Sequence, residues 1–291
     1  MTLPIVLIHG LWLTPRSWEG WKARFEQRGH EVLAPAWPCM DREVEALRRD
    51  PSVMNGLGVT EVVSHYDSIV RGLDTPPVIM GHSFGGLITE LLLDRGLGAA
   101  GVAISPAQVK GVFRLPPAQL RTVWPALRNP ANNKKTVPLT PRQFRFRFTN
   151  TMNDADSQAA YDRYYVPGPG RVLFQAGFAN FNPHAVTKVD FQKHDRPPLL
   201  VIGNGRDHTV PASVSKEAAT RLGKSKAVVE YKEFAGRPHL TAGAPGWEEV
   251  ADYALDWANG HVGASHRSPV ADVPHFNNRG DKHELGQHFA Y

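Results

Sequence analysis

Six short apolar runs recur along the chain, separated by stretches whose apolar residues follow a helical period. The runs occupy residues 4–9, 31–34, 78–80, 100–104, 198–202 and 228–234. The first run is continuous and rich in β-branched residues, which is typical of a strand buried on both faces of a parallel sheet. Between the runs, Trp18, Trp21 and Phe25 are spaced as on one helix face, and residues 62–73 and 247–257 are also predicted helices. This alternation predicts an α/β fold with a mostly parallel sheet flanked by helices.

Residues 106–196 interrupt the alternation. Their composition shifts towards Pro, Asn, Arg and aromatic side chains, with one helical pattern at 120–127. Because this insertion separates predicted strands on the substrate side of the sheet, we expect it to form a helical cap over a core made of 1–105 and 197–260. Most of its aromatic residues are expected to build the cap's own small core, although some could line an apolar pocket.

The last stretch, 261–291, is polar and contains five histidines. Their spacing matches no helical pair of metal ligands, so the sequence favours a flexible or surface-bound tail over a metal site. We therefore expect no metal centre in this protein.

The composition is that of an ordinary soluble globular protein, with 42% hydrophobic and 21% charged residues among 291. The net charge of +5 comes from scattered basic residues, densest at Lys134, Lys135 and Arg142, which favours a solvated face over a nucleic-acid groove. Cys39 is the single cysteine, which excludes an intramolecular disulfide and a cysteine-based zinc site. No apolar stretch reaches about twenty residues, and the N-terminal run lacks the basic flank of a signal peptide. We expect a cytoplasmic protein without a membrane span.

The candidate nucleophile lies in segment 77–90. There the run 78–80 leads into Gly-His-Ser-Phe-Gly at 81–85, and a helical pattern follows at once. This order predicts a strand, a sharp turn and a helix. Glycines two residues before and after Ser83 suit such a turn, because a nucleophile at a strained φ/ψ brings neighbouring backbone too close for a Cβ. G-x-S-x-G between a strand and a helix is the pattern of a nucleophile elbow, with Ser83 as the nucleophile.

A second loop of interest follows the first predicted strand, which ends in His9-Gly10 and is followed by Leu11. A glycine lets the chain turn without obstructing the point where negative charge develops, and a backbone N–H aimed at that point stabilises the charge. Leu11 and Phe84 are therefore the candidate oxyanion-hole donors through their backbone N–H groups. The alternative is an ordinary strand-to-helix turn.

The candidate acid and base follow two later strands. Asp207 comes after 198–202 in a polar, glycine-containing turn, and His239 lies in the loop after the last predicted strand. A carboxylate is needed there because the base of a serine must be held in one tautomer. For Asp207 the alternative role is to cap the following helix. The order Ser83, Asp207, His239 is that of nucleophile, acid and base.

These motifs together give the chain a resemblance to the α/β-hydrolases that carry a mobile cap. The resemblance covers the expected core on both sides of the insertion and implies an eight-stranded, mostly parallel sheet. Because this chain starts directly at the strand before His9-Gly10, we expect the two leading antiparallel strands to be missing and the sheet edge to be truncated. Such proteins commonly have a glycine before the catalytic histidine, whereas this chain has Pro238, which restricts the approach of that loop.

The predicted chemistry is acyl transfer through a covalent ester on Ser83, with His239 as base, Asp207 as its orienting acid, and neither cofactor nor metal. We expect hydrolysis of a carboxylic ester or lactone of a small to medium apolar substrate. The candidate substrate-binding residues are Trp12, His82, Phe178 and Val210. Hydrolysis of a carbon–carbon bond next to a carbonyl uses the same triad, and a non-catalytic ligand-binding member of the fold is a third alternative. The sequence leaves the oligomeric state open.

Overall fold

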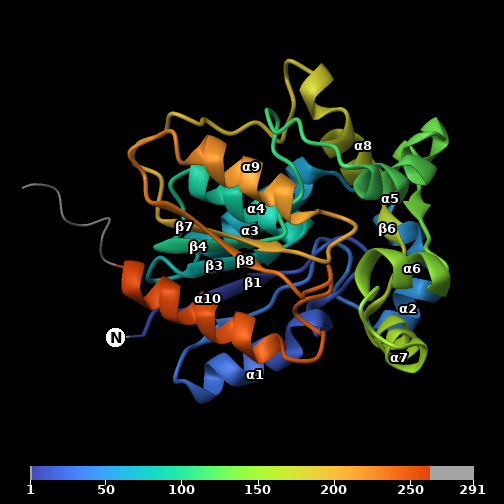
Figure 1. The fold of residues 1–291 in the computed structure, drawn as a ribbon, viewed down its shortest axis with the longest axis horizontal. Coiled ribbons are helices and arrows are strands. Elements are labelled where there is room, and N and C mark those ends of the chain that lie inside the picture. The colour runs from blue at the N-terminus through green and yellow to red at the C-terminus, as the bar shows by residue number, and fades with distance from the viewer. Residues whose placement is uncertain (1, 263–291) are drawn as a thin grey trace, which may run out of the picture.

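One central sheet organises the fold. In the computed structural model, which describes residues 2–262, six strands pair in parallel in the order β2-β1-β3-β4-β7-β8 (Figure 1). The strands are β1 (Ile5–Ile8), β2 (Val32–Leu33), β3 (Val78–His82), β4 (Ala100–Ile104), β7 (Leu199–Asn204) and β8 (Val229–Phe234). Four of them are buried along their whole length, as expected for strands covered on both faces. All six strands predicted from the apolar runs are present.

The truncated sheet edge is confirmed for the described residues. Within residues 2–262 no antiparallel strand pairs with the sheet, and the two-residue strand β2 forms one edge while β8 forms the other. Because every strand runs the same way, the loops that follow their carboxyl ends meet at one end of the sheet. Ligand sites of open α/β sheets lie at this end.

Helices cover both faces of the sheet (Figure 1). One face carries α1 (Glu19–Gln27) and α10 (Trp247–His261), and the other carries α3 (Val59–Arg71), α4 (Phe84–Asp94) and α9 (Ala212–Leu222). Alternate residues of β1 point to opposite sides: Ile5 packs with α1 and α10, whereas Val6 packs with the other group. The remaining core elements are η1 (Pro15–Trp18), α2 (Val44–Arg49) and η2 (Pro51–Met54).

The insertion folds beside the loops at the carboxyl ends of the strands (Figure 1). Its elements are α5 (Pro117–Leu127), η3 (Pro130–Lys134), β5 (Thr136–Val137), α6 (Pro141–Phe148), α7 (Asp154–Tyr164), β6 (Gly168–Pro169), α8 (Gly170–Gly177) and η4 (Ala179–Phe181). The short strands β5 and β6 pair antiparallel. Phe144 and Phe148 are fully buried and stack with ring centroids 4.8 Å apart, and Tyr161 and Tyr165 pack edge-on against Phe144. These aromatic residues form the small core expected within the insertion.

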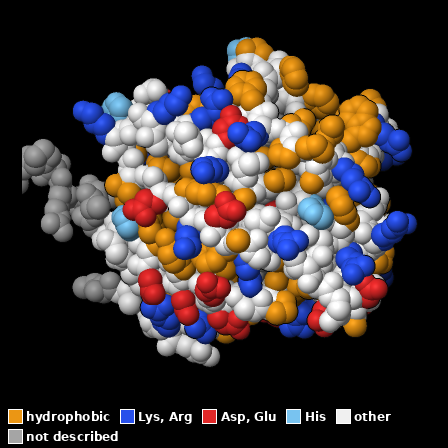
Figure 2. Space-filling model, in the orientation of Figure 1, with side chains coloured by type: hydrophobic (Ala, Val, Ile, Leu, Met, Phe, Trp, Pro, Cys, Tyr) orange, Lys and Arg blue, Asp and Glu red, His pale blue; other side chains and the backbone are white. Residues whose placement is uncertain are grey.

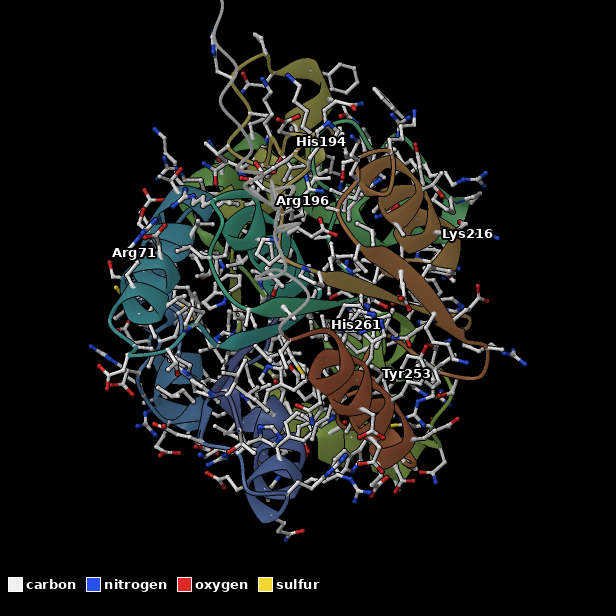
Figure 3. All side chains as sticks on the ribbon, turned by 90° about the vertical axis from the view of Figure 1, so that its left-hand side faces the viewer. Arg71, His194, Arg196, Lys216, Tyr253 and His261 are labelled. Carbon is white, nitrogen blue, oxygen red and sulfur yellow. The ribbon has the colours of Figure 1, made fainter. Side chains whose placement is uncertain are left out.

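From residue 182 the chain returns to β7 without forming a helix or strand. Arg196, on this return segment, is almost fully buried, and its Nη2 donates to the Asp94 carboxylate at 3.3 Å and to the Asp190 carbonyl (Figure 3). The N–H of Asp190 also donates to Asp94, at 3.1 Å. These contacts fasten the return segment, residues 182–198, to the C-terminal end of α4.

The remaining expectations concern the tail, a membrane-spanning helix and the single cysteine. Apart from His261 and Val262, the predicted tail 261–291 lies outside the described residues. Among residues 2–262, no helix is both long enough and apolar enough to cross a membrane. Cys39 lies exposed in the loop after β2.

Candidate active site

Ser83 lies on the turn between β3 and α4, as predicted. Its φ of 58° is positive, which is a strained conformation for a residue with a side chain. Ser83 N–H donates to the carbonyl of Ile104 in β4 at 2.9 Å, and Ser83 O accepts the N–H of Ala107 at 2.9 Å. Because α4 begins at the next residue, the serine is fixed between the ends of two strands and the start of a helix.

Close packing explains the glycines around Ser83. A Cβ at Gly81 would overlap the carbonyl oxygen of Gly85, and a Cβ at Gly85 would overlap the carbonyl oxygen of Ile8 in β1. A Cβ at Gly10 would lie 2.9 Å from the Cβ of Ser83. The elbow therefore packs directly against the loop after β1, and neither surface has room for another side chain.

The two backbone N–H groups predicted to stabilise an oxyanion form no backbone hydrogen bond among the described residues. The backbone N–H of Leu11 donates to no other backbone group within residues 2–262. Phe84 is the first residue of α4, so its N–H has no acceptor one turn earlier in the helix. Gly10 brings the first of these loops into contact with Ser83, where a developing oxyanion would form.

His9 supports this loop from its buried side. Its Nε2 accepts the N–H of Trp37 at 3.2 Å, so the proton lies on Nδ1, which donates to the carbonyl of Gly10 at 3.0 Å. Burial lowers the pKa of His9 to about 4, and the ring is therefore neutral at neutral pH. His9 thus fixes the carbonyl that precedes Leu11.

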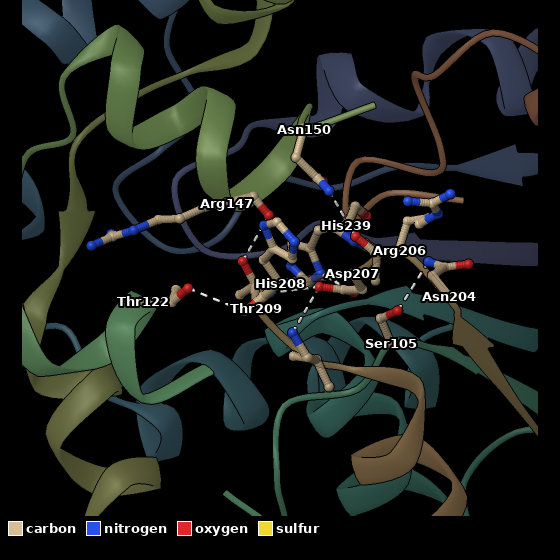
Figure 4. Close-up of polar contacts among 12 residues, drawn as sticks. Ser105, Thr122, Arg147, Asn150, Asn204, Arg206, Asp207, His208, Thr209 and His239 are labelled. Carbon is tan, nitrogen blue, oxygen red and sulfur yellow. Dashed lines mark hydrogen bonds and ion pairs between the residues drawn. The ribbon is translucent and has the colours of Figure 1, made fainter. Parts of the chain in front are cut away.

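Both oxygens of the Asp207 carboxylate, after β7, accept hydrogen bonds (Figure 4). Oδ1 accepts the N–H groups of Thr209 and Val210 at 2.7 and 2.8 Å, and Oδ2 accepts Nδ1–H of His239 at 2.6 Å. The alternative role as a helix cap is absent, because α9 starts later, after Pro211, without a side-chain cap. Asp207 instead stabilises the turn before that helix and binds His239 at the same time.

His239 is held in one tautomer by this contact. A carboxylate only accepts hydrogen bonds at neutral pH, so the proton lies on Nδ1 and the lone pair on Nε2. Nε2 is buried and has no hydrogen-bond partner among the described residues. The ring packs edge-on against Phe148 and lies 4.6 Å, centroid to centroid, from His82, the residue before Ser83. A fixed imidazole with an unused Nε2 can accept a proton.

His82 holds the backbone of His239. Its Nε2–H donates to the carbonyl of His239 at 2.7 Å, and the same carbonyl accepts the N–H of Thr241 at 2.8 Å. Burial lowers the pKa of His82, with a smaller contribution from His239, so the ring is neutral. His82, which was predicted to bind substrate, therefore contacts the backbone of His239 instead, and only the structure shows this long-range contact.

A cavity of about 270 Å³ opens at Ser83 between the core and the insertion. Trp12, Phe178 and Val210, three of the four predicted substrate-binding residues, line it, whereas His82 does not. Side chains of α5 also line the cavity: Leu120, Val123, Trp124 and Leu127. The sequence shows the helical spacing of these residues, but it does not show which face of α5 is turned towards the cavity.

The cavity walls are mainly apolar. The polar side chains in them, besides Ser83, are Gln108, Gln119 and Thr209. A wider and more open cleft of about 750 Å³ lies near β2, but its walls include none of the predicted triad. We therefore place the candidate active site in the smaller cavity, which Ser83 lines.

Comparison with known proteins finds the same architecture elsewhere. A monoacylglycerol lipase from Paleococcus ferrophilus is 22% identical, with a TM-score of 0.62 over 90% of this chain and 97% of that chain. An extracellular alpha/beta-hydrolase from a Paenibacillus species is 19% identical (TM-score 0.65; 87% and 98% covered), and a pyrethroid hydrolase from Sphingobium faniae is 15% identical (TM-score 0.58; 89% and 98% covered). At these identities the likeness establishes the fold alone. None of the curated protein sequences matches the chain. Residues 5–253 match the model of the alpha/beta hydrolase family, and the chain belongs to that family.

Proposed function

We propose that this protein is a serine hydrolase that cleaves a carboxylic ester or lactone of a small to medium apolar substrate. One observation carries the proposal: Ser83 stands on a strained turn at an apolar cavity, and the imidazole of an Asp207–His239 pair bonded at 2.6 Å packs 4.6 Å from the ring of His82, the residue before Ser83. Family membership supports a hydrolase. Structural neighbours named as a monoacylglycerol lipase and a polyneuridine aldehyde esterase support ester chemistry.

The reaction has two stages. Ser83 Oγ attacks the carbonyl carbon while its proton passes to Nε2 of His239, and the backbone N–H groups of Leu11 and Phe84 stabilise the oxyanion. His239 then gives that proton to the departing alkoxide, and an acyl group remains on Ser83. Water attacks this ester, loses a proton to Nε2, and the acid leaves as the proton returns to Ser83. Asp207 keeps the required tautomer throughout.

The insertion would act as the cap of this site. Its helices α5 and α8 supply the apolar walls opposite Ser83, and the cavity between them suits the apolar acyl or ring part of a substrate. His82 would act as a positioning residue, because its bond fixes the carbonyl of the catalytic base and it does not line the cavity.

The proposal is tested with p-nitrophenyl esters of increasing acyl length and a serine-directed fluorophosphonate. Wild-type protein should hydrolyse the esters and take up the label, and Ser83→Ala should do neither. Ser105→Ala is the matched control, because Ser105 also ends a strand at positive φ but does not line the cavity. The Ser105→Ala variant should still take up the fluorophosphonate label.

Two results would contradict this assignment. Labelling without hydrolysis of any p-nitrophenyl ester or of any lactone would favour the alternative of carbon–carbon bond hydrolysis by the same triad. Absence of both labelling and hydrolysis in folded wild-type protein would leave a non-catalytic member of the family.

A further inference from the structure

An unusual share of the exposed apolar surface surrounds the mouth of the cavity. Nine large apolar side chains among residues 2–262 are prominently exposed, and six of them form what we call the apolar rim: Phe113, Leu115, Leu120, Trp124, Phe178 and Phe181. Five line the cavity itself, and Phe113 lines an adjoining hollow together with Leu115 and Phe181. In the space-filling view, apolar side chains gather over this end of the insertion, with basic side chains beside them (Figure 2). Contiguous apolar surface of this kind marks an interaction site.

Basic residues predominate in the stretch of chain that carries most of the rim, although the Glu217 carboxylate accepts the N–H groups of Phe113 and Arg114. Residues 106–153 contain nine Lys and Arg and no Asp or Glu, although the whole chain has 33 basic and 28 acidic residues. Six exposed basic side chains of this stretch form no ion pair within residues 2–262: Arg114, Arg121, Arg128, Lys134, Lys135 and Arg142. Basic groups without acidic partners contribute a positive field to this part of the insertion's surface.

Helix α5 combines both features. Leu120 and Trp124 stand one turn apart and are 43% and 56% exposed. Arg121 lies between them in the sequence and lines a shallow surface hollow together with Leu120 and Trp124, and Arg128 follows at the end of the helix. A helix with exposed apolar residues and long basic side chains next to them is the pattern of an interfacial helix, in which the apolar residues insert and the basic groups stay at the headgroups.

We propose that the apolar rim and its basic surroundings dock this protein on an anionic lipid surface. Leu120 and Trp124 enter the acyl boundary, and Arg121 and Arg128 bind the negative headgroups. Charge complementarity favours a lipid surface of this kind over a neutral one, and a tryptophan ring suits the boundary between lipid and water. The docking does not depend on catalysis. Only its consequence, that an amphiphile passes from the lipid into the cavity at Ser83, rests on the proposed function.

The test measures binding of the full chain to vesicles. The protein should co-sediment with phosphatidylglycerol vesicles and only weakly with phosphatidylcholine vesicles, and raising the salt from about 0.01 M to about 1 M should release it. Ser83→Ala should bind as well as wild type, which separates docking from hydrolysis.

Trp124 supplies a second readout. Of the seven tryptophans it is the one that stands well exposed, while the other six are buried or half-buried. Phosphatidylglycerol vesicles should shift tryptophan emission to shorter wavelength and protect it from iodide. Trp124→Phe should still bind but lose this spectral change.

Paired variants separate the two contributions. Arg121→Gln with Arg128→Gln should weaken binding to phosphatidylglycerol about 25-fold, since each basic group near an anionic surface contributes about fivefold. Lys224→Gln with Lys226→Gln is the matched control, because these exposed lysines precede β8 at the opposite end of the sheet. Leu120→Ala with Trp124→Ala should reduce binding to both vesicle types, and Tyr253→Ala, an exposed aromatic residue on α10, should not.

Three outcomes would overturn the proposal. They are equal binding to both vesicle types, failure of the arginine pair to differ from the lysine pair, and an iodide-accessible Trp124 in vesicle-bound protein. A dimer that protects Trp124 without vesicles would show instead that a second copy covers the rim. Unchanged circular dichroism and thermal midpoints of the variants exclude unfolding as the cause of any loss.

Discussion

The two sides of the cavity are built differently. On the core side, each group next to the reaction is fixed by buried contacts: Ser83 by its strained turn, Asp207 by three hydrogen bonds, and His239 by contacts at both Nδ1 and its carbonyl. On the insertion side, large apolar side chains such as Trp124 and Phe178 stand half exposed. The core side of the cavity is therefore held by buried contacts, whereas the insertion side presents partly exposed apolar side chains.

The largest effect on activity is expected for Asp207→Asn, which changes the contact with His239 on the core side of the cavity. The amide oxygen can keep the two backbone N–H bonds, but the amide nitrogen then faces Nδ1 of His239, which must become an acceptor. The proton moves to Nε2 and the base is lost. We expect kcat to fall about 10⁴-fold, the loss known for this change in a serine protease.

The measurement is kcat for p-nitrophenyl ester hydrolysis together with the thermal midpoint. Asp195→Asn, an exposed carboxylate on the return segment, should change neither. Retention of more than a tenth of the wild-type rate in folded Asp207→Asn would mean that the tautomer of His239 is not controlled from this side.

An intermediate effect on stability is expected at Glu90, buried in α4 without a hydrogen-bond partner among the described residues. Burial raises its pKa from 4.5 to about 8, against a smaller opposing effect of Arg196. Between pH 4.5 and 8 the unfolded chain releases this proton and the folded chain keeps it, so the folded state loses stability as pH rises. Glu90→Gln removes the ionisation and should raise the free energy of unfolding by up to about 3 kcal/mol at pH 7.

Urea unfolding at pH 7 and at pH 4.5 checks this prediction, because the gain should disappear at the lower pH. Glu45→Gln, at an exposed position on α2, should stay within about 0.5 kcal/mol of wild type at both. A gain of equal size at both pH values would assign the effect to packing instead of charge.

The smallest effect on activity is expected for a substitution on the insertion side of the cavity. Phe178→Ala removes one apolar wall of the cavity without touching the triad. We expect kcat/KM to fall about fivefold for a long acyl ester, which corresponds to about 1 kcal/mol of lost apolar contact, and to stay unchanged for the acetate. Phe113→Ala, outside that cavity, is the control. A uniform loss over all chain lengths would show that the insertion also positions the catalytic groups.

The same contrast explains what the sequence could predict. The strands and the elbow were readable because buried parallel strands need continuous apolar runs, and because the turn at Ser83 needs glycines at fixed offsets. Asp207 and His239 were readable because each follows a strand in a fixed order. Every one of these signals is local.

The remaining features depend on contacts between distant segments. His82 bonds to a carbonyl 157 residues later, and nothing near it in the sequence distinguishes this role from contact with a substrate. The orientation of α5 depends on how the insertion packs, so periodicity could identify the helix and not its outer face. The charge segregation was present in the sequence, but the net charge of +5 concealed it, because acidic residues elsewhere offset the basic stretch 106–153.

The return segment has a consequence for engineering. Because β4 and β7 are parallel neighbours, the chain that leaves one strand at its carboxyl end must travel the length of the sheet before it enters the other. Residues 182–198 form this connection, and the contact between Arg196 and Asp94 anchors them to the core. A chimera that exchanges this insertion between relatives should therefore be joined after β4 and before residue 182, so that the recipient keeps its own return segment.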